Sequence, residues 1–184
     1  GAEEDCPAER MDMANLSRIT GNAFAGVSDE EKDRLSIALF LLKKLISRMD
    51  TDDDDDMDAL AQVMHNALMR DDQCEVLDIC RDADIDFTAP IHSRGSVFCL
   101  RDKCLDSNYG VKVIRKFLEY GIDMDQAVVK GKTPAIVVAS ATPKKMLFSG
   151  KKDDYFEKAA EFFSRESMEQ LDHSGMAAVH WAAG

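Results

Sequence analysis

Two stretches near the C-terminal end of this chain match each other in the order of their apolar, small and turn-forming residues. The first is FLEYGIDMDQAVVKGKTPAIVVAS, residues 117–140, and the second is FFSRESMEQLDHSGMAAVHWAAG, residues 162–184. In both, a glycine comes shortly before a run of small apolar residues, and these glycines, Gly131 and Gly175, lie 44 residues apart. Because a short helical unit cannot bury its apolar face alone, repetition of this kind indicates a stack of similar units.

The two copies resemble the ankyrin repeat, a β-turn followed by two antiparallel helices in about 33 residues, with a T-P-L-H-x-A signature. Thr133 and Pro134 match the signature, although Ile136 stands where the family has histidine. In the second copy His180 matches, and an Ala-Ala pair at 177–178 replaces Thr-Pro. The resemblance implies an all-α, ankyrin-type solenoid of stacked helix pairs, joined by short β-turn-like connections.

The residues around this signature have structural roles at the start of a helix. Thr133 is expected to cap the helix, and Pro134 to occupy its first turn, where a missing N–H costs no hydrogen bond. Small residues such as Ala135 and Ala139 let neighbouring helices approach closely. In the family the signature histidine hydrogen-bonds the turn between repeats, so the resemblance implies a structural role for His180.

The chain is expected to have three parts. Residues 1–27 are expected to be poorly ordered or irregular, residues 28–56 to form an atypical N-terminal helical cap and an acidic loop, and residues 57–184 to form about three and a half ankyrin-like repeats. An insertion is expected near 142–154, because the 44-residue spacing exceeds the usual unit of about 33.

Several helices are predicted before the best-matched repeats. Ser28 and Glu31 form a capping box that opens a helix through residue 49, with a buried face at Leu35, Leu39, Leu42 and Ile46. Further helices are predicted at the start of 74–87, over 96–106 and over 110–125, the last ending at Gly121. Gly95 is expected in a turn.

The aspartate run Asp52–Asp56 suggests two interpretations, a calcium loop or a helix cap. An EF-hand loop needs glycine at position six and glutamate at position twelve, and no frame beginning at Asp50, Asp52 or Asp53 supplies them. The sequence therefore favours a solvated loop whose last carboxylates cap a helix beginning near Met57.

Other chemistry is poorly supported. A phosphate loop ending at Gly131-Lys132-Thr133 would need a glycine at position 126, which is glutamine. The chain has no G-x-S-x-G, and His173 and His180 are expected in a turn and a helix rather than as a metal pair. We therefore expect no catalytic residue, no enzyme activity, no metal and no cofactor.

The five cysteines include no C-x-x-C pair, which favours buried free thiols in a reducing compartment over zinc or disulfides. No apolar run reaches the roughly 20 residues of a membrane helix. The chain is therefore expected to be cytoplasmic, with a removed N-terminal signal as the open alternative.

Residues 1–60 carry 16 acidic and seven basic side chains, and the whole chain has a net charge of −12. Nucleic acid and membranes are therefore not expected as partners.

Binding of another protein is the function that these observations favour. In ankyrin proteins, turn tips and the exposed side of the first helices form a concave binding surface. Transferred position by position, the resemblance implies that partner-binding residues lie on two turn tips and one inner helix. They are Val129, Lys130, Lys132, Ser140, His173, Ser174 and Met176. Lys132 is expected to face outward.

Three questions about partners stay open from the sequence. The lysine-rich insertion, with Met146, Leu147 and Phe148 at its centre, is either a solvated loop or a contact for an acidic partner, a membrane surface or the acidic N-terminal part. The chain is alternatively the recognition arm of a larger enzyme or effector whose catalytic part lies beyond residue 184. Weak self-association through an open C-terminal end is a further alternative.

Overall fold

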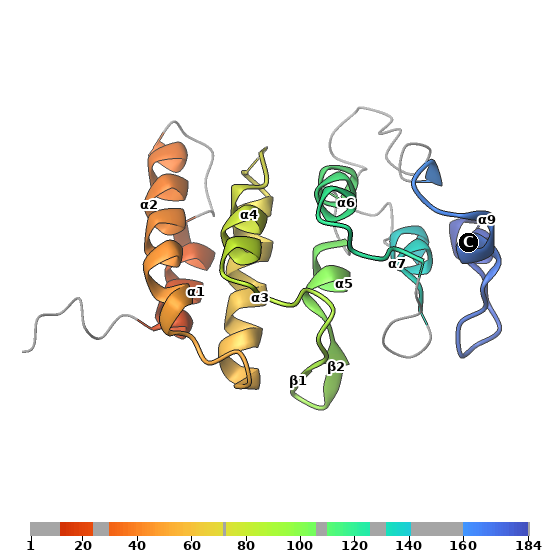
Figure 1. Ribbon diagram of the computed structural model, residues 1–184, viewed down its shortest axis with the longest axis horizontal. Helices are drawn as coiled ribbons and strands as arrows, with labels where there is room; N and C mark the ends of the chain where they lie inside the picture. The colour runs from red at the N-terminus through yellow and green to blue at the C-terminus, as the bar shows by residue number, and fades with distance from the viewer. Residues whose placement is uncertain are drawn as a thin grey trace, which may run out of the picture. The chain divides into compact units, whose positions relative to one another are not determined.

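A computed structural model describes residues 12–23, 30–71, 73–105, 110–125, 132–140 and 160–183 (Figure 1). This part of the chain is mostly helical, as expected, and includes one small two-stranded sheet. The fold divides into an N-terminal unit, residues 1–86, and a C-terminal unit, residues 87–184. Each unit is described by itself below.

The N-terminal unit is a helical assembly in which α1 packs on both α2 and α3, and α4 packs on α2 and α3. Its elements are α1 (Met13–Ala23), α2 (Glu30–Leu45) with the 3₁₀ turn η2 (Ile46–Arg48), α3 (Asp54–Leu68) and α4 (Glu75–Asp82). The largest fully buried side chains of this core are Leu16, Leu42, Leu60, Met64, Leu68 and Leu77.

Helix α1 lies inside the segment that was expected to be irregular, so that expectation is wrong for residues 13–23. Its buried stripe is narrow, because Met13, Leu16 and Thr20 carry it and the intervening residues are mainly polar or small. Thr20 accepts a hydrogen bond from the buried Asn66 of α3 at 3.2 Å. This polar contact across 46 residues produces no apolar periodicity in the sequence.

The predicted helix in 28–49 is confirmed as α2 and η2, with Leu39, Leu42 and Ile46 buried and Leu35 half-buried. Ser28 of the predicted capping box lies outside the described residues.

The aspartate run caps a helix, as predicted, but the capping residue is Asp53 rather than one of the last carboxylates of the run. The side chain of Asp53 accepts hydrogen bonds from the main-chain N–H groups of Asp55 and Asp56, at 2.8 and 3.2 Å, and so caps α3. The helix therefore begins at Asp54, the residue after the cap, which is three residues before the predicted start at Met57.

The C-terminal unit contains the hairpin strands β1 (Ile91–Ser93) and β2 (Ser96–Phe98), followed by short helices. These are α5 (Leu100–Leu105), α6 (Gly110–Glu119), α7 (Pro134–Ser140), α9 (Arg165–Glu169) and α10 (Ala178–Ala183). Helix α5 packs against α6 and α7, and α7 packs against α9 and α10. The fully buried side chains include Leu100, Leu105, Ile114, Phe117 and Ile136.

The hairpin corrects the prediction of a single helix over 96–106. Arg94 and Gly95 both have positive φ, at 49° and 77°. Two such residues in a row make the tight turn that joins antiparallel strands, and Ser93 pairs with Ser96 across it. The expected turn at Gly95 is therefore confirmed, and the helix begins only at Leu100.

Helices α4 and α6 end in the same way. Asp84 and Gly121, which lie 37 residues apart, both have a left-handed backbone, with φ of 57° and 73°. In each case the next residue, an isoleucine, donates its N–H five residues back, to the carbonyl of Cys80 at 3.1 Å or of Phe117 at 2.9 Å. This pattern is the Schellman motif, and it confirms Gly121 as the predicted C-terminal cap of α6.

Candidate functional site

The candidate site begins at the N-terminus of α7. The hydroxyl of Thr133 accepts a hydrogen bond from the N–H of Ile136 at 3.2 Å, and Pro134 is the first residue of the helix. Both predicted roles are therefore confirmed. Thr133 is completely buried, so the main chain of the residue before it, Lys132, is held at the edge of the core.

The second part of the site is the turn 172–176, which is organised by the carboxylate of Asp172. One carboxylate oxygen accepts main-chain hydrogen bonds from Ser174 at 2.8 Å and from Met176 at 3.0 Å. Gly175 has φ of 72°, a conformation that costs glycine little, and its N–H reaches the Asp172 carbonyl. The turn is thus closed by side-chain and main-chain bonds together.

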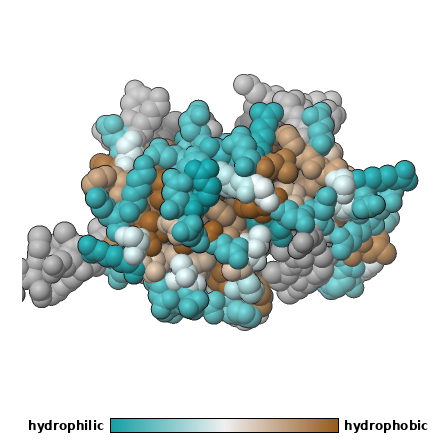
Figure 2. All heavy atoms as spheres, in the orientation of Figure 1, coloured by the Kyte–Doolittle hydropathy of each residue, from teal (hydrophilic) through white to brown (hydrophobic). Residues whose placement is uncertain are grey.

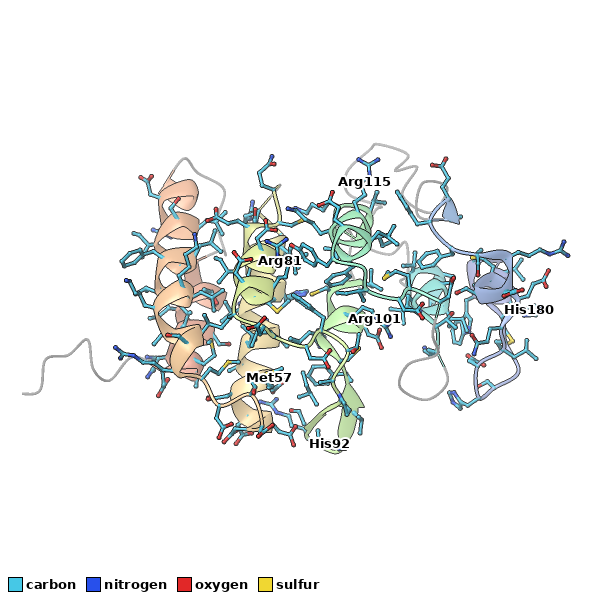
Figure 3. All side chains as sticks on the ribbon, viewed as in Figure 1. Met57, Arg81, His92, Arg101, Arg115 and His180 are labelled. Carbon is cyan, nitrogen blue, oxygen red and sulfur yellow. The ribbon has the colours of Figure 1, made fainter. Side chains whose placement is uncertain are left out.

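Helix α10 follows this turn and packs on α7 through Ala178, which lies in one cluster with Ala135 and Ile136. His180 accepts a hydrogen bond from the N–H of Ala177 at 2.9 Å (His180 is labelled in Figure 3). This bond satisfies a main-chain donor at the start of α10, much as Thr133 does for α7. The imidazole therefore has a structural hydrogen bond.

Trp181 joins the two parts of the site. Its indole N–H donates to the other oxygen of Asp172 at 3.0 Å, and the Nζ of Lys132 lies 4.9 Å from the centre of its ring system. A cation at this distance is attracted by the face of an indole, by about 0.5–1 kcal/mol at an exposed site. Lys132 is therefore half-buried, with its ammonium over the partly exposed ring of Trp181.

Exposed hydrophobic side chains lie near Asp172 and Trp181 in the sequence. Leu171 and Val179 are 56% and 59% exposed, and Trp181 itself is 38% exposed. The space-filling view shows a mainly hydrophilic face interrupted by hydrophobic patches (Figure 2). We call Lys132, Leu171, Val179, Trp181 and the turn 172–176 the Trp181 surface.

The structure unites only some of the residues predicted to bind a partner. His173 and Ser174 are exposed and Met176 is half-buried, all in the turn 172–176, and Lys132 joins this turn through Trp181. Ser140 lies at the last residue of α7 and its hydroxyl donates to the Val137 carbonyl at 3.1 Å. Val129, Lys130 and the insertion near 142–154 lie outside the described residues.

Sequence reasoning missed Asp172 and Trp181, the two residues that connect the site. Asp172 stands three residues before Gly175, a spacing typical of the first position of a tight turn, so the sequence did carry a signal for it. Trp181 offered no comparable signal. Its two partners lie nine and 49 residues away, and only packing of α10 on α7 brings them together.

The charge of Asp172 depends on its hydrogen bonds. The N–H of Met176, then that of Ser174, the indole of Trp181 and the nearby His173 hold the pKa of this carboxyl below its ordinary value of 3.8. A carboxylate whose pKa is lower in the folded state stabilises that state fully above its ordinary pKa, and the stabilisation is lost as the pH falls through the folded-state pKa.

The fluorescence of Trp181 should report this titration, since it is the chain's single tryptophan. We expect its emission to be constant above about pH 4 and to change at lower pH, as Asp172 takes up a proton. Asp172→Asn should show altered emission already at pH 7, because the amide that replaces one carboxylate oxygen cannot accept both sets of bonds. Circular dichroism at each pH controls for general unfolding. Identical spectra for wild type and variant at pH 7 would contradict this assignment.

Burial keeps two of the described thiols, Cys80 and Cys99, protonated. Cys74, Cys80, Cys99 and Cys104 are buried thiols that form no disulfide, as predicted. Burial raises the pKa of Cys80 to about 12, and burial with the charge of Asp102 raises that of Cys99 to about 11. Both are therefore uncharged thiols near neutral pH, and a thiol is a poor nucleophile.

Within the described ranges, no group of three or more His, Cys, Asp or Glu side chains is arranged to hold a metal ion. Nor does that part of the chain contain a helix both long and apolar enough to cross a membrane. Comparison with known proteins gives no assignment: no protein-family model, no curated protein and no solved structure matches this chain.

Proposed function

We propose that this chain is a non-catalytic protein-interaction module that binds its partner through the Trp181 surface. The observation that carries the proposal is the Lys132 ammonium held over the Trp181 ring, whose N–H is fixed by Asp172. Tryptophan is enriched among the residues that dominate protein interfaces, especially where it is already oriented. Trp181 meets this description, being partly exposed and fixed by two contacts.

We further propose that the repeats are divergent ankyrin repeats stacked into a solenoid. Three local features support this proposal. The matched ends of α4 and α6 recur after 37 residues, close to the usual unit of about 33. Thr133 and Pro134 start α7 as the family signature requires, and His180 binds the first turn of α10. The turn 172–176 then corresponds to a tip of the proposed concave surface.

The chemistry of the Trp181 surface favours a protein partner over a nucleic acid. The chain carries a net charge of −12, which repels a phosphate backbone, and exposed Leu171 and Val179 offer apolar contact instead. A peptide segment with an apolar side chain next to a carboxylate would contact both the indole and the Lys132 ammonium.

A photo-crosslinking amino acid placed at Val179 tests this proposal, because that side chain is 59% exposed on α10, the helix that carries Trp181. In extract of the cells in which this protein naturally occurs, we expect one discrete crosslinked protein. Trp181→Ala should weaken its capture by about 30-fold, the effect of losing a binding hot spot of about 2 kcal/mol. Lys132→Glu should also weaken it.

The same crosslinker at Glu161, an exposed residue outside the Trp181 surface, is the matched control. Crosslinks that are equal at both positions, or that persist unchanged in Trp181→Ala, would contradict the proposed binding surface.

A further inference from the structure

Helix α2 exposes a second hydrophobic face in the N-terminal unit. Ile37 and Phe40 are each 59% exposed, while Ala38, Leu39 and Leu42 on the opposite side are buried. At 3.6 residues per turn the two sets lie on opposite sides of the helix. One apolar face therefore serves the core, and the other has no role in the core.

The exposed face has the spacing of a helix-pairing seam. Asp33, Ile37, Phe40 and Lys44, all exposed, follow one another at intervals of four, three and four residues. This alternation is the spacing of core positions in two-helix coiled coils. The Nζ of Lys44 lies 5.7 Å from the centre of the Phe40 ring, so its side chain lies along the same line. We call these four residues the α2 seam.

The α2 seam is complementary to itself in one orientation only. If a second copy of α2 lies antiparallel, with the twofold axis midway between Ile37 and Phe40, Ile37 faces Phe40 of the second copy. The same axis places Asp33 opposite Lys44 of the second copy, so two oppositely charged pairs flank the apolar centre. A parallel arrangement would instead place Asp33 against Asp33 and Lys44 against Lys44.

We propose that the α2 seam is a homodimer contact, formed by antiparallel pairing of α2 with α2 of a second copy of this chain. The inference does not rest on the proposed partner-binding function, since it uses residues of the N-terminal unit alone. Helix α2 has 16 residues and is about 24 Å long. A contact made through one such helix is small for a stable interface, so a dissociation constant on the order of 10 µM is expected.

Sedimentation velocity of the whole chain between about 1 and 500 µM tests the proposal. The wild type should pass from monomer to dimer over this range, and Phe40→Glu should remain monomeric throughout. Met69→Glu is the matched control, because Met69 is a similarly exposed apolar residue of the same unit, at 55%. It should dimerise as the wild type does. Circular dichroism should show the same helix content in all three.

A charge exchange tests the antiparallel orientation. Asp33→Lys or Lys44→Asp alone should weaken the dimer about tenfold at low salt, since each replaces two attractive pairs by two repulsive ones. The double variant Asp33→Lys/Lys44→Asp should restore it. Both changes oppose the helix dipole, so a gain in helix stability would not explain the restoration.

Each other outcome would overturn the proposal. A wild type that stays monomeric at 500 µM has no such contact. A dimer that Phe40→Glu leaves intact and Trp181→Ala abolishes would place self-association on the Trp181 surface instead. Single charge variants that dimerise normally, or a double variant that fails to recover, would exclude the antiparallel pairing.

Discussion

Replacing Arg101 by alanine is expected to lower the free energy of unfolding by about 3–5 kcal/mol, the cost of breaking a buried charged network from one side. Only 2% of the Arg101 side chain is exposed. Its Nε donates to the Asp102 carboxylate at 3.3 Å, and a terminal nitrogen donates to the Asp123 carbonyl after α6 (Arg101 is labelled in Figure 3). The alanine variant leaves the Asp102 carboxylate, which is 13% exposed, and the Asp123 carbonyl without this donor.

The expected loss should depend on pH. Burial raises the pKa of Asp102 above its ordinary 3.8, and the charge of Arg101 acts in the opposite direction. Without Arg101 the pKa should rise further, so the folded variant binds a proton more readily than its unfolded chain does. Its stability therefore increases, relative to wild type, as the pH falls toward the raised pKa of Asp102.

Urea denaturation at pH 7 and pH 5 measures both effects. Arg165→Ala is the matched control, because Arg165 pairs with Glu169 at 2.7 Å on the surface, with 88% of its side chain exposed. That variant should lose less than about 1 kcal/mol. A loss of similar size in the two arginine variants would show that Arg101 is not a buried structural contact.

Replacing Phe117 by alanine is expected to cost about 3–5 kcal/mol, the range for removing a buried aromatic side chain. Phe117 of α6 is fully buried, and its ring centre lies 5.2 Å from that of Phe87, which adds an aromatic contact to the apolar burial. The loss comes from the cavity and from the removed contacts together. Urea denaturation again provides the measurement.

Leu118→Ala, at the next position of the same helix, separates burial from helix propensity. Leu118 is 41% exposed, so its truncation should cost less than about 1 kcal/mol. Phe117→Leu should fall between the two, because leucine fills part of the cavity. Equal losses for Phe117→Ala and Leu118→Ala would contradict the assignment of Phe117 to the core.

The predictions made from sequence were confirmed where a structure depends on neighbours along the chain. Gly121 after α6 and Thr133 before α7 act as expected, and the aspartate run caps α3, although through Asp53 rather than its last carboxylates. A cap joins groups two to five residues apart, so the residue type and its spacing carry most of the information.

The same reasoning failed where the signal was weak or distributed. Helix α1 was missed because its buried stripe includes a threonine bonded to Asn66, 46 residues away. The hairpin was missed because strands of three residues are too short to show alternation. The link between the two predicted tips was also missed, because Lys132 reaches the turn 172–176 through Trp181, which donates to Asp172.

By itself, the sequence determined that this chain is mostly helical, where several of its helices start and stop, and which turn residues follow them. Only the tertiary structure decided that α2 keeps an exposed apolar seam opposite its buried face, and that Lys132 meets Trp181. The physical reason is how far apart along the chain the interacting residues lie. Caps and periodic faces are made by residues within a few positions of each other, whereas a contact across 49 residues exists only after α7 and α10 have packed together.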